Sequence, residues 1–179
     1  MNKKVLLLHG WGGSDFPHWQ SWLAGEIAKE YGKVSFLKLS DFDTPKLDVW
    51  LGELKDELEN FQPDIIICHS LANTLWFHLC NTESILIIEH LYLVAPPSLS
   101  CELDELQEFF PVKIPKNLYA KNTLLITSTN DPYMSEDEAK ELQNELQIEM
   151  NILQNAGHIN SDSGFGKWEW ILNELRSKL

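Results

Sequence analysis

A serine, an aspartate and a histidine follow the ends of three separate apolar segments, in that chain order. They are Ser70, Asp131 and His158. A serine hydroxyl is a weak nucleophile unless an imidazole accepts its proton, and a carboxylate can hold that imidazole in the required tautomer. The pattern therefore favours nucleophilic acyl transfer, with Ser70 as nucleophile, His158 as base and Asp131 as the orienting acid.

The stretch Cys-His-Ser-Leu-Ala at 68–72 predicts a sharp turn from a buried strand into a helix. Such a nucleophile elbow exposes the serine and directs backbone N–H groups at the oxygen that becomes negatively charged. The N–H of Leu71 is one candidate for this oxyanion hole, and the N–H of Trp11, in the glycine-rich stretch 10–13, is the other. Ser70 could instead be an ordinary helix N-cap, because Cys68 and Ala72 replace the two usual glycines.

The remaining histidines have structural interpretations. His9 is expected to hold the glycine-rich stretch, His69 to pack on the sheet, and His18 to open the first helix. His78 and His90 fit helix-end or surface roles. Asp131 could also be only a turn residue, since Asn-Asp-Pro is a strong turn signal. Other carboxylates that could orient the base are Glu136, Asp137 and Asp162.

The elements that must position these side chains can be predicted from hydrophobic periodicity. The expected strands are 3–9, 33–39, 64–68, 90–96, 122–129 and 148–153. The expected helices are 18–31, 46–61, 71–82, 136–146 and 167–179, with a short helical piece near 102–110. The alternation of strands and helices along the chain predicts a mostly parallel six-stranded sheet with helices on both faces, in a single domain over 1–179. In such a sheet the functional groups gather at the carboxyl ends of the strands.

Composition limits the partners of this chain. The net charge of −13 argues against nucleic acid and anionic membrane surfaces as partners. Three cysteines at no metal-ligand spacing are expected to be reduced thiols in a cytoplasmic protein, without metal or cofactor. The apolar runs are too short for a membrane span, and the N-terminal segment does not have the pattern of a signal peptide.

A pocket for a small apolar acyl group is expected around the three residues. Its predicted lining consists of Trp11, Pro97, Leu99, Phe109, Tyr133, Met134 and Phe165. For Phe165, packing in the core is the stronger interpretation. No insertion is long enough to form a large lid, so Phe109 and Phe110 are the candidates for a partial cover.

Four segments together resemble the small serine hydrolases of the YdeN and retinoblastoma-binding-protein-nine family. They are HGWGGSDFPHWQSWL at 9–23, CHSLA at 68–72, NDPY at 130–133 and GHINSDSGFGKW at 157–168. The resemblance covers essentially the whole chain. It implies a minimal three-layer α/β-hydrolase fold, the catalytic roles given above for Ser70, Asp131 and His158, and hydrolysis of carboxylic esters or amides.

The leading hypothesis is a cytoplasmic serine hydrolase that acts on small esters. A second hypothesis is a protein-binding module on a hydrolase scaffold, with weak or no activity and an unidentified protein partner. A third is an acyl or peroxide-forming transferase, which would share the same three residues and differ in the acceptor of the acyl group. The sequence does not decide between ester, amide and transfer chemistry.

Overall fold

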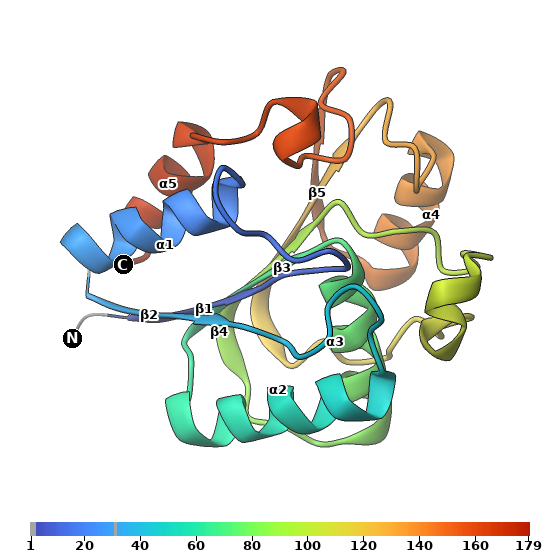
Figure 1. The fold of residues 1–179 in the computed structure, drawn as a ribbon, viewed down its shortest axis with the longest axis horizontal. Helices are drawn as coiled ribbons and strands as arrows, with labels where there is room; N and C mark the ends of the chain where they lie inside the picture. The colour runs from blue at the N-terminus through green and yellow to red at the C-terminus, as the bar shows by residue number, and fades with distance from the viewer. Residues whose placement is uncertain (1–2, 31) are drawn as a thin grey trace.

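The computed structural model describes residues 3–30 and 32–179, in which six parallel strands form one sheet with helices on both faces (Figure 1). The strands are β1 (Lys4–Leu8), β2 (Lys33–Leu37), β3 (Ile65–His69), β4 (Ile88–Val94), β5 (Ala120–Ser128) and β6 (Glu149–Leu153). The helices are α1 (Trp19–Glu30), α2 (Leu47–Phe61), α3 (Leu71–Thr82), α4 (Glu136–Leu146) and α5 (Glu169–Arg176). The order across the sheet is β2-β1-β3-β4-β5-β6, and every neighbouring pair is parallel. The predicted three-layer fold is confirmed.

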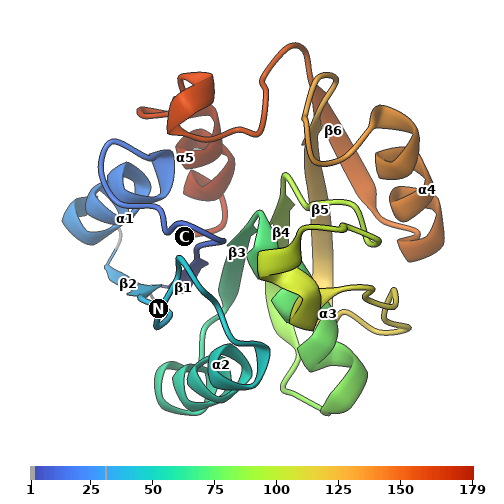
Figure 2. The same ribbon diagram turned by 45° about the vertical axis from the view of Figure 1, so that its right-hand side comes forward.

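Two cores lie on opposite faces of the sheet, because successive side chains of a strand point to opposite faces. Val5 and Leu7 of β1 pack in one core with helices α1 and α5, and Leu6 and Leu8 pack in the other with α2, α3 and α4. The same separation of helices is visible in Figure 2. A continuous apolar run such as residues 5–8 is therefore what a parallel strand covered on both faces requires.

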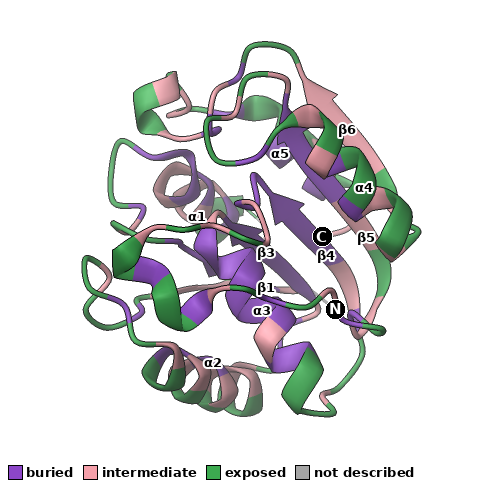
Figure 3. Ribbon diagram, turned by 90° about the vertical axis from the view of Figure 1, so that its right-hand side faces the viewer, coloured by how far each residue is buried: buried purple, intermediate pink, exposed green. Residues whose placement is uncertain are grey.

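The strands at the centre of the sheet are the most deeply buried part of the molecule (Figure 3). All five residues of β3 are buried, whereas β2 and β6, the two edge strands, are mostly half-buried. β3 is also the strand that leads directly into the segment of Ser70. The elbow is consequently built on the most deeply buried strand of the sheet.

Several boundaries differ from the sequence expectation by a few residues. Helix α5 begins at Glu169 rather than at residue 167, because Trp168 has a non-helical backbone. The helical piece between β4 and β5 is a 3₁₀ helix, η1 (Asp104–Phe109), which ends shortly before Pro111. The predicted helix over 18–31 ends at residue 31, which lies outside the described residues.

No helix among the described residues is long and apolar enough to cross a membrane.

Candidate active site

Ser70 occupies a strained turn between β3 and α3. Its backbone has φ +54° and ψ −125°, in a region that side-chain-bearing residues rarely adopt. Its hydroxyl makes no capping hydrogen bond to α3. The interpretation of Ser70 as an ordinary N-cap is therefore wrong, because an N-cap residue has extended backbone and its hydroxyl accepts from the first helical turn.

Contacts from two neighbouring segments hold this turn. The Ser70 N–H donates to the carbonyl of Val94 at 3.0 Å. The buried amide of Asn73 donates to the carbonyls of Ser70 at 2.7 Å and of Val94 at 2.9 Å. A Cβ atom on Gly10 would lie only 2.8 Å from the Ser70 Cβ, so the loop after β1 can approach the elbow only with glycine at this position.

The structure brings Ser70, His158 and Asp131 together. The Ser70 Oγ lies 2.8 Å from Nε2 of His158, and Nδ1 of His158 lies 2.9 and 3.0 Å from the two carboxylate oxygens of Asp131. The side chains of His158 and Asp131 are 9% and 3% exposed. With Nδ1–H donating to Asp131, Nε2 carries the lone pair and can accept the Ser70 proton.

The two loops that carry Asp131 and His158 are tied to each other. Oδ1 of Asn130 accepts from the N–H of Gly157 at 2.8 Å, and the Ser128 hydroxyl accepts from the N–H of Ala156 at 2.9 Å. These bonds join the residues at the end of β5 to the loop after β6. They fix the separation of the carboxylate and the imidazole independently of the bond between them.

The alternative carboxylates have other surroundings. Glu136 pairs with Lys140 at 2.7 Å, and Asp137 lies 3.8 Å from the same ammonium group. Asp162 is exposed and lies at the rim of the cavity that contains Ser70. Asp131 is therefore the carboxylate that contacts His158.

Three further histidines near the elbow are buried and neutral. Burial lowers the pKa of His9 and of His69. Burial, together with a smaller electrostatic effect of the nearby His158, lowers the pKa of His18 to about 4. His9 holds the glycine-rich loop as expected, through bonds to Gly10 O and to the N–H of Leu39. Nε2 of His69 lies 3.1 Å from the carbonyl of His158 and supports that loop from below.

The two backbone N–H groups named as oxyanion donors have no protein acceptor within the described part of the chain. The N–H of Gly12 donates to Phe42 O and that of Gly13 to Gly10 O, whereas those of Trp11 and Leu71 make no such bond. The indole of Trp11 donates to Asp43 O, which anchors the loop against the segment after β2.

A cavity of about 250 Å³ opens above Ser70 and His158. Three residues of the predicted pocket line it, namely Trp11, Pro97 and Tyr133. The Tyr133 ring lies edge-on to the His158 ring at 4.6 Å. The predicted pocket did not include seven further residues that line the cavity: His18, Cys101, Leu103, Leu106, Asn160, Ser161 and Asp162. His18 follows shortly after the glycine-rich stretch 10–13, and this position could have indicated that it lines the cavity.

The predicted pocket is corrected at four positions, which do not line the cavity. Phe109 is fully buried and packs edge-on against Trp50, and Met134 and Leu99 pack in the core beneath α2, α3 and α4. Phe165 packs against Trp168 in the other core. Phe109 and Met134 are buried, and Leu99 and Phe165 are half-buried against the cores, so none of the four forms a wall of the cavity. Phe110 packs against the first core too and does not cover the site.

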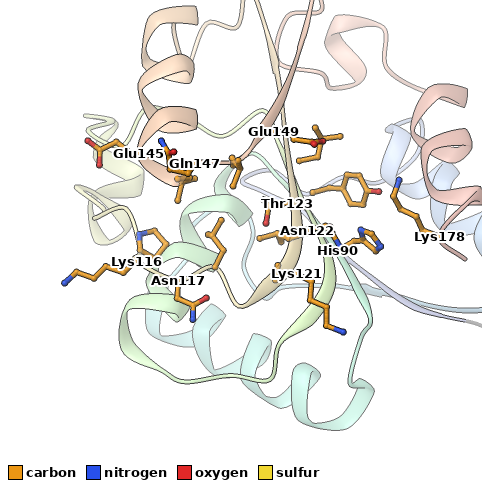
Figure 4. Close-up of a pocket in the computed structure, with 18 of the residues that line it drawn as sticks. His90, Lys116, Asn117, Lys121, Asn122, Thr123, Glu145, Gln147, Glu149 and Lys178 are labelled. Atoms are coloured by element: carbon orange, nitrogen blue, oxygen red, sulfur yellow. The ribbon is translucent and has the colours of Figure 1, made fainter.

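A larger groove, of about 590 Å³, lies elsewhere. It is lined by residues at the amino-terminal ends of β4, β5 and β6, at the edge of the sheet opposite Ser70 (Figure 4). Lys116, Lys121 and Lys178 point in different directions around it (Figure 4). The groove therefore offers no convergent set of charges, and the candidate active site is the smaller cavity.

The elbow itself has no metal-binding cluster within the described residues, and its cysteine, Cys68, is not a reactive thiol. Among the described residues, no cluster of three or more histidine, cysteine or acidic side chains could hold a metal ion. Burial raises the pKa of the Cys68 thiol well above its usual range, so this neighbour of the elbow stays protonated and unreactive.

Comparisons with known proteins identify relatives of this chain. The sequence model of the serine hydrolase family matches residues 5–177. The chain is 26% identical to the YdeN protein of Bacillus subtilis, over 99% of this chain and 96% of that protein. The crystal structure of the ydeN gene product superposes with a TM-score of 0.87 at 22% identity, covering 98% and 97% of the two chains.

Two other solved structures extend the likeness. A YdeN-like protein from Pectobacterium atrosepticum has a TM-score of 0.72 and 27% identity, over 96% of this chain and 88% of that chain. The esterase domain of a Rhodothermus marinus protein has a TM-score of 0.65 and 12% identity, over 98% and 87% of the two chains. The match over nearly the whole chain, together with these likenesses, shows that the chain belongs to the serine hydrolase family.

Proposed function

We propose that this hydrolase cleaves small carboxylic esters through an acyl-enzyme on Ser70, with His158 as general base and Asp131 as the orienting acid. The observation that carries the proposal is the continuous set of short contacts from Asp131 through His158 to the Ser70 hydroxyl, on a turn with φ +54°. Strain of this kind is retained where it exposes a reactive group.

The proposed reaction proceeds in two halves. The Ser70 Oγ attacks the ester carbonyl carbon while its proton passes to Nε2 of His158, and the N–H groups of Trp11 and Leu71 stabilise the negative oxygen. His158 then gives the proton to the departing alkoxide, which leaves as an alcohol. Water, deprotonated by the same imidazole, hydrolyses the acyl-enzyme and restores the Ser70 hydroxyl.

The acyl group of the proposed substrate is short. Pro97, Leu103 and Leu106 form an apolar wall of the cavity, and its volume of about 250 Å³ lies below the roughly 300–1,000 Å³ of pockets that enclose drug-sized ligands. Esters are favoured over amides on chemical grounds, since an alkoxide is a better leaving group than an amide anion.

Replacement of the nucleophile tests the proposal directly. Ser70→Ala is expected to lower kcat/KM for p-nitrophenyl butyrate at least about 10³-fold and to abolish fluorophosphonate labelling, with an unchanged circular dichroism spectrum. Ser100→Ala, an exposed serine on the loop after β4, is the matched control. Labelling that persists in Ser70→Ala would contradict the assignment, and an unlabelled wild-type protein would favour the binding-module hypothesis.

The orienting acid is tested by a pair of aspartate variants. Asp131→Asn keeps the shape but favours the wrong His158 tautomer, so kcat should fall by up to about 10⁴-fold. Asp162→Asn, at the rim of the same cavity, should stay within about threefold of the wild type. The reverse pattern would move the acid to the loop after β6.

The pH profile of kcat/KM follows from the need for a neutral imidazole. Protonation of His158 at low pH removes the acceptor for the Ser70 proton, so kcat/KM should fall on the acid side by about tenfold per pH unit. The pKa of His18 is lowered to about 4 and that of His69 is also lowered, so these two histidines should stay neutral over this range. The decrease of kcat/KM on the acid side should therefore correspond to the uptake of a single proton. A flat profile between about pH 5 and 8 would exclude a histidine base.

Acyl-chain preference is the fourth test. In a series of p-nitrophenyl esters, acetyl and butyryl should exceed palmitoyl by about tenfold or more in kcat/KM, because a cavity of this size encloses only a short chain. A preference for palmitoyl would mean that the segment between β4 and β5 opens a longer channel.

A further inference from the structure

The walls of the catalytic cavity belong to different halves of the molecule. Leu103 and Leu106, on one side, pack in the core beneath α2, α3 and α4. The polar wall is formed by His18, Asn160, Ser161 and Asp162. Its flanking residues, Trp19 and Ile159, pack in the core on the opposite face of the sheet. The cavity is therefore apolar on one side of the sheet edge and polar on the other.

The polar wall lies on the His158 side of the cavity. His158 and residues 160–162 belong to one loop, and helix α1 is bonded to that loop at two points. The Trp19 indole N–H donates to Ile159 O at 2.8 Å, and the Trp19 backbone N–H donates to Phe165 O at 3.0 Å. The ring of His18 is thereby held 4.8 Å from that of His69, which in turn lies 5.3 Å from that of His158.

His18, one of the residues of this wall, carries an unpaired donor. Its Nδ1 accepts from the N–H of Gln20 at 3.2 Å, so the proton of the neutral ring is on Nε2. This Nε2 atom is buried and has no hydrogen-bond partner among the described residues, and His18 as a whole is only 4% exposed. Buried N–H groups are normally paired, and an unpaired one requires an explanation such as a functional role. The other buried unpaired side-chain atoms of the described residues, on Ser14, Gln20, Asn73 and Thr127, belong to residues that do not line this cavity.

A second polar group on the same wall is available for a ligand. Oδ1 of Asn160 accepts from the N–H and the hydroxyl of Ser163 at 3.0 and 2.9 Å. Its Nδ2 makes no hydrogen bond to the described part of the chain, so its two N–H donors are free. His18 and Asn160 thus present donors rather than acceptors. Because the pKa of His18 is lowered to about 4, its ring is an uncharged donor near neutral pH.

We propose that His18 is a specificity-determining residue, whose Nε2–H, with the Asn160 amide, binds an oxygen on the alcohol part of the ester. The inference rests on the proposed function, in which His158 gives its proton to the departing oxygen. The leaving alcohol must therefore lie beside Nε2 of His158, next to the polar wall, while the acyl chain lies against Leu103 and Leu106. The substrates are short-chain esters of alcohols that carry a hydroxyl or ether oxygen near the ester bond.

Three butyrate esters of nearly equal size test this inference in the wild-type protein. They are 2-hydroxyethyl, 2-methoxyethyl and propyl butyrate, hydrolysed in a pH-stat. The two oxygen-bearing esters should exceed propyl butyrate about tenfold in kcat/KM, since one hydrogen bond from the enzyme is gained. The methoxyethyl ester accepts but cannot donate, so its advantage identifies the enzyme as the donor. Equal values for all three esters would overturn the inference.

Variants at His18 assign the preference to this side chain. His18→Phe keeps the volume and removes the donor, so the preference for the oxygen-bearing esters, taken as the ratio of kcat/KM values measured on the variant itself, should fall to about one. His18→Met is measured in the same way if the phenylalanine variant does not fold. His90→Phe, at the opposite edge of the sheet, is the control and should keep the preference. An unchanged preference with an equal loss on all three esters would mean a structural role for His18 and overturn the inference.

The failure of the proposed function is distinguishable from the failure of this inference. If the wild-type protein hydrolyses p-nitrophenyl butyrate and is labelled at Ser70, but shows no preference among the three esters, the inference alone is wrong. If Ser70 is not labelled and none of the esters is hydrolysed, the proposed function is wrong and the inference falls with it.

Discussion

The rest of the site depends on one backbone constraint, the positive φ of Ser70 between the last residue of β3 and the first of α3. A side-chain-bearing residue in this conformation is unfavourable by about 1–3 kcal/mol and persists only where its surroundings determine it. Here Val94 and Asn73 hold the backbone on one side, and Gly10 permits close contact on the other. The strain lifts the hydroxyl out of the core and leaves the N–H of Leu71 without a protein acceptor.

The elbow accommodates Cys68 and Ala72 without the two usual glycines. Both residues are fully buried in the core beneath α2, α3 and α4. The tight approach is achieved instead at Gly10, on the neighbouring strand end, where an added Cβ would overlap Ser70. Glycine is needed wherever two backbones meet most closely, and here that position is on the partner loop rather than on the elbow itself.

Burial sets the electrostatic character of the site. The chain carries a net charge of −13, yet the groups beneath the elbow are neutral, because burial lowers the pKa values of His9, His18 and His69. Asp131 and His158 are consequently the ionisable groups in direct contact with each other at the elbow. Neutral imidazoles around them can donate or accept hydrogen bonds without competing for the Asp131 carboxylate.

The fold and the residues at the strand ends could be predicted from the amino-acid pattern alone. Continuous apolar runs alternating with amphipathic helices allow little other than a parallel sheet covered on both faces, and such a sheet places residues 70, 131 and 158 at one edge. Which carboxylate reaches His158, and which side chains line the cavity, became evident from the folded chain. Both depend on contacts between distant segments, such as those of Asn130 with Gly157 and of Trp19 with Ile159. An aromatic residue such as Phe109 has the same local sequence pattern in a core as in a pocket. From the sequence, His18 is only a residue at a helix start, and its place in the cavity wall depends on the contact between α1 and the loop after β6.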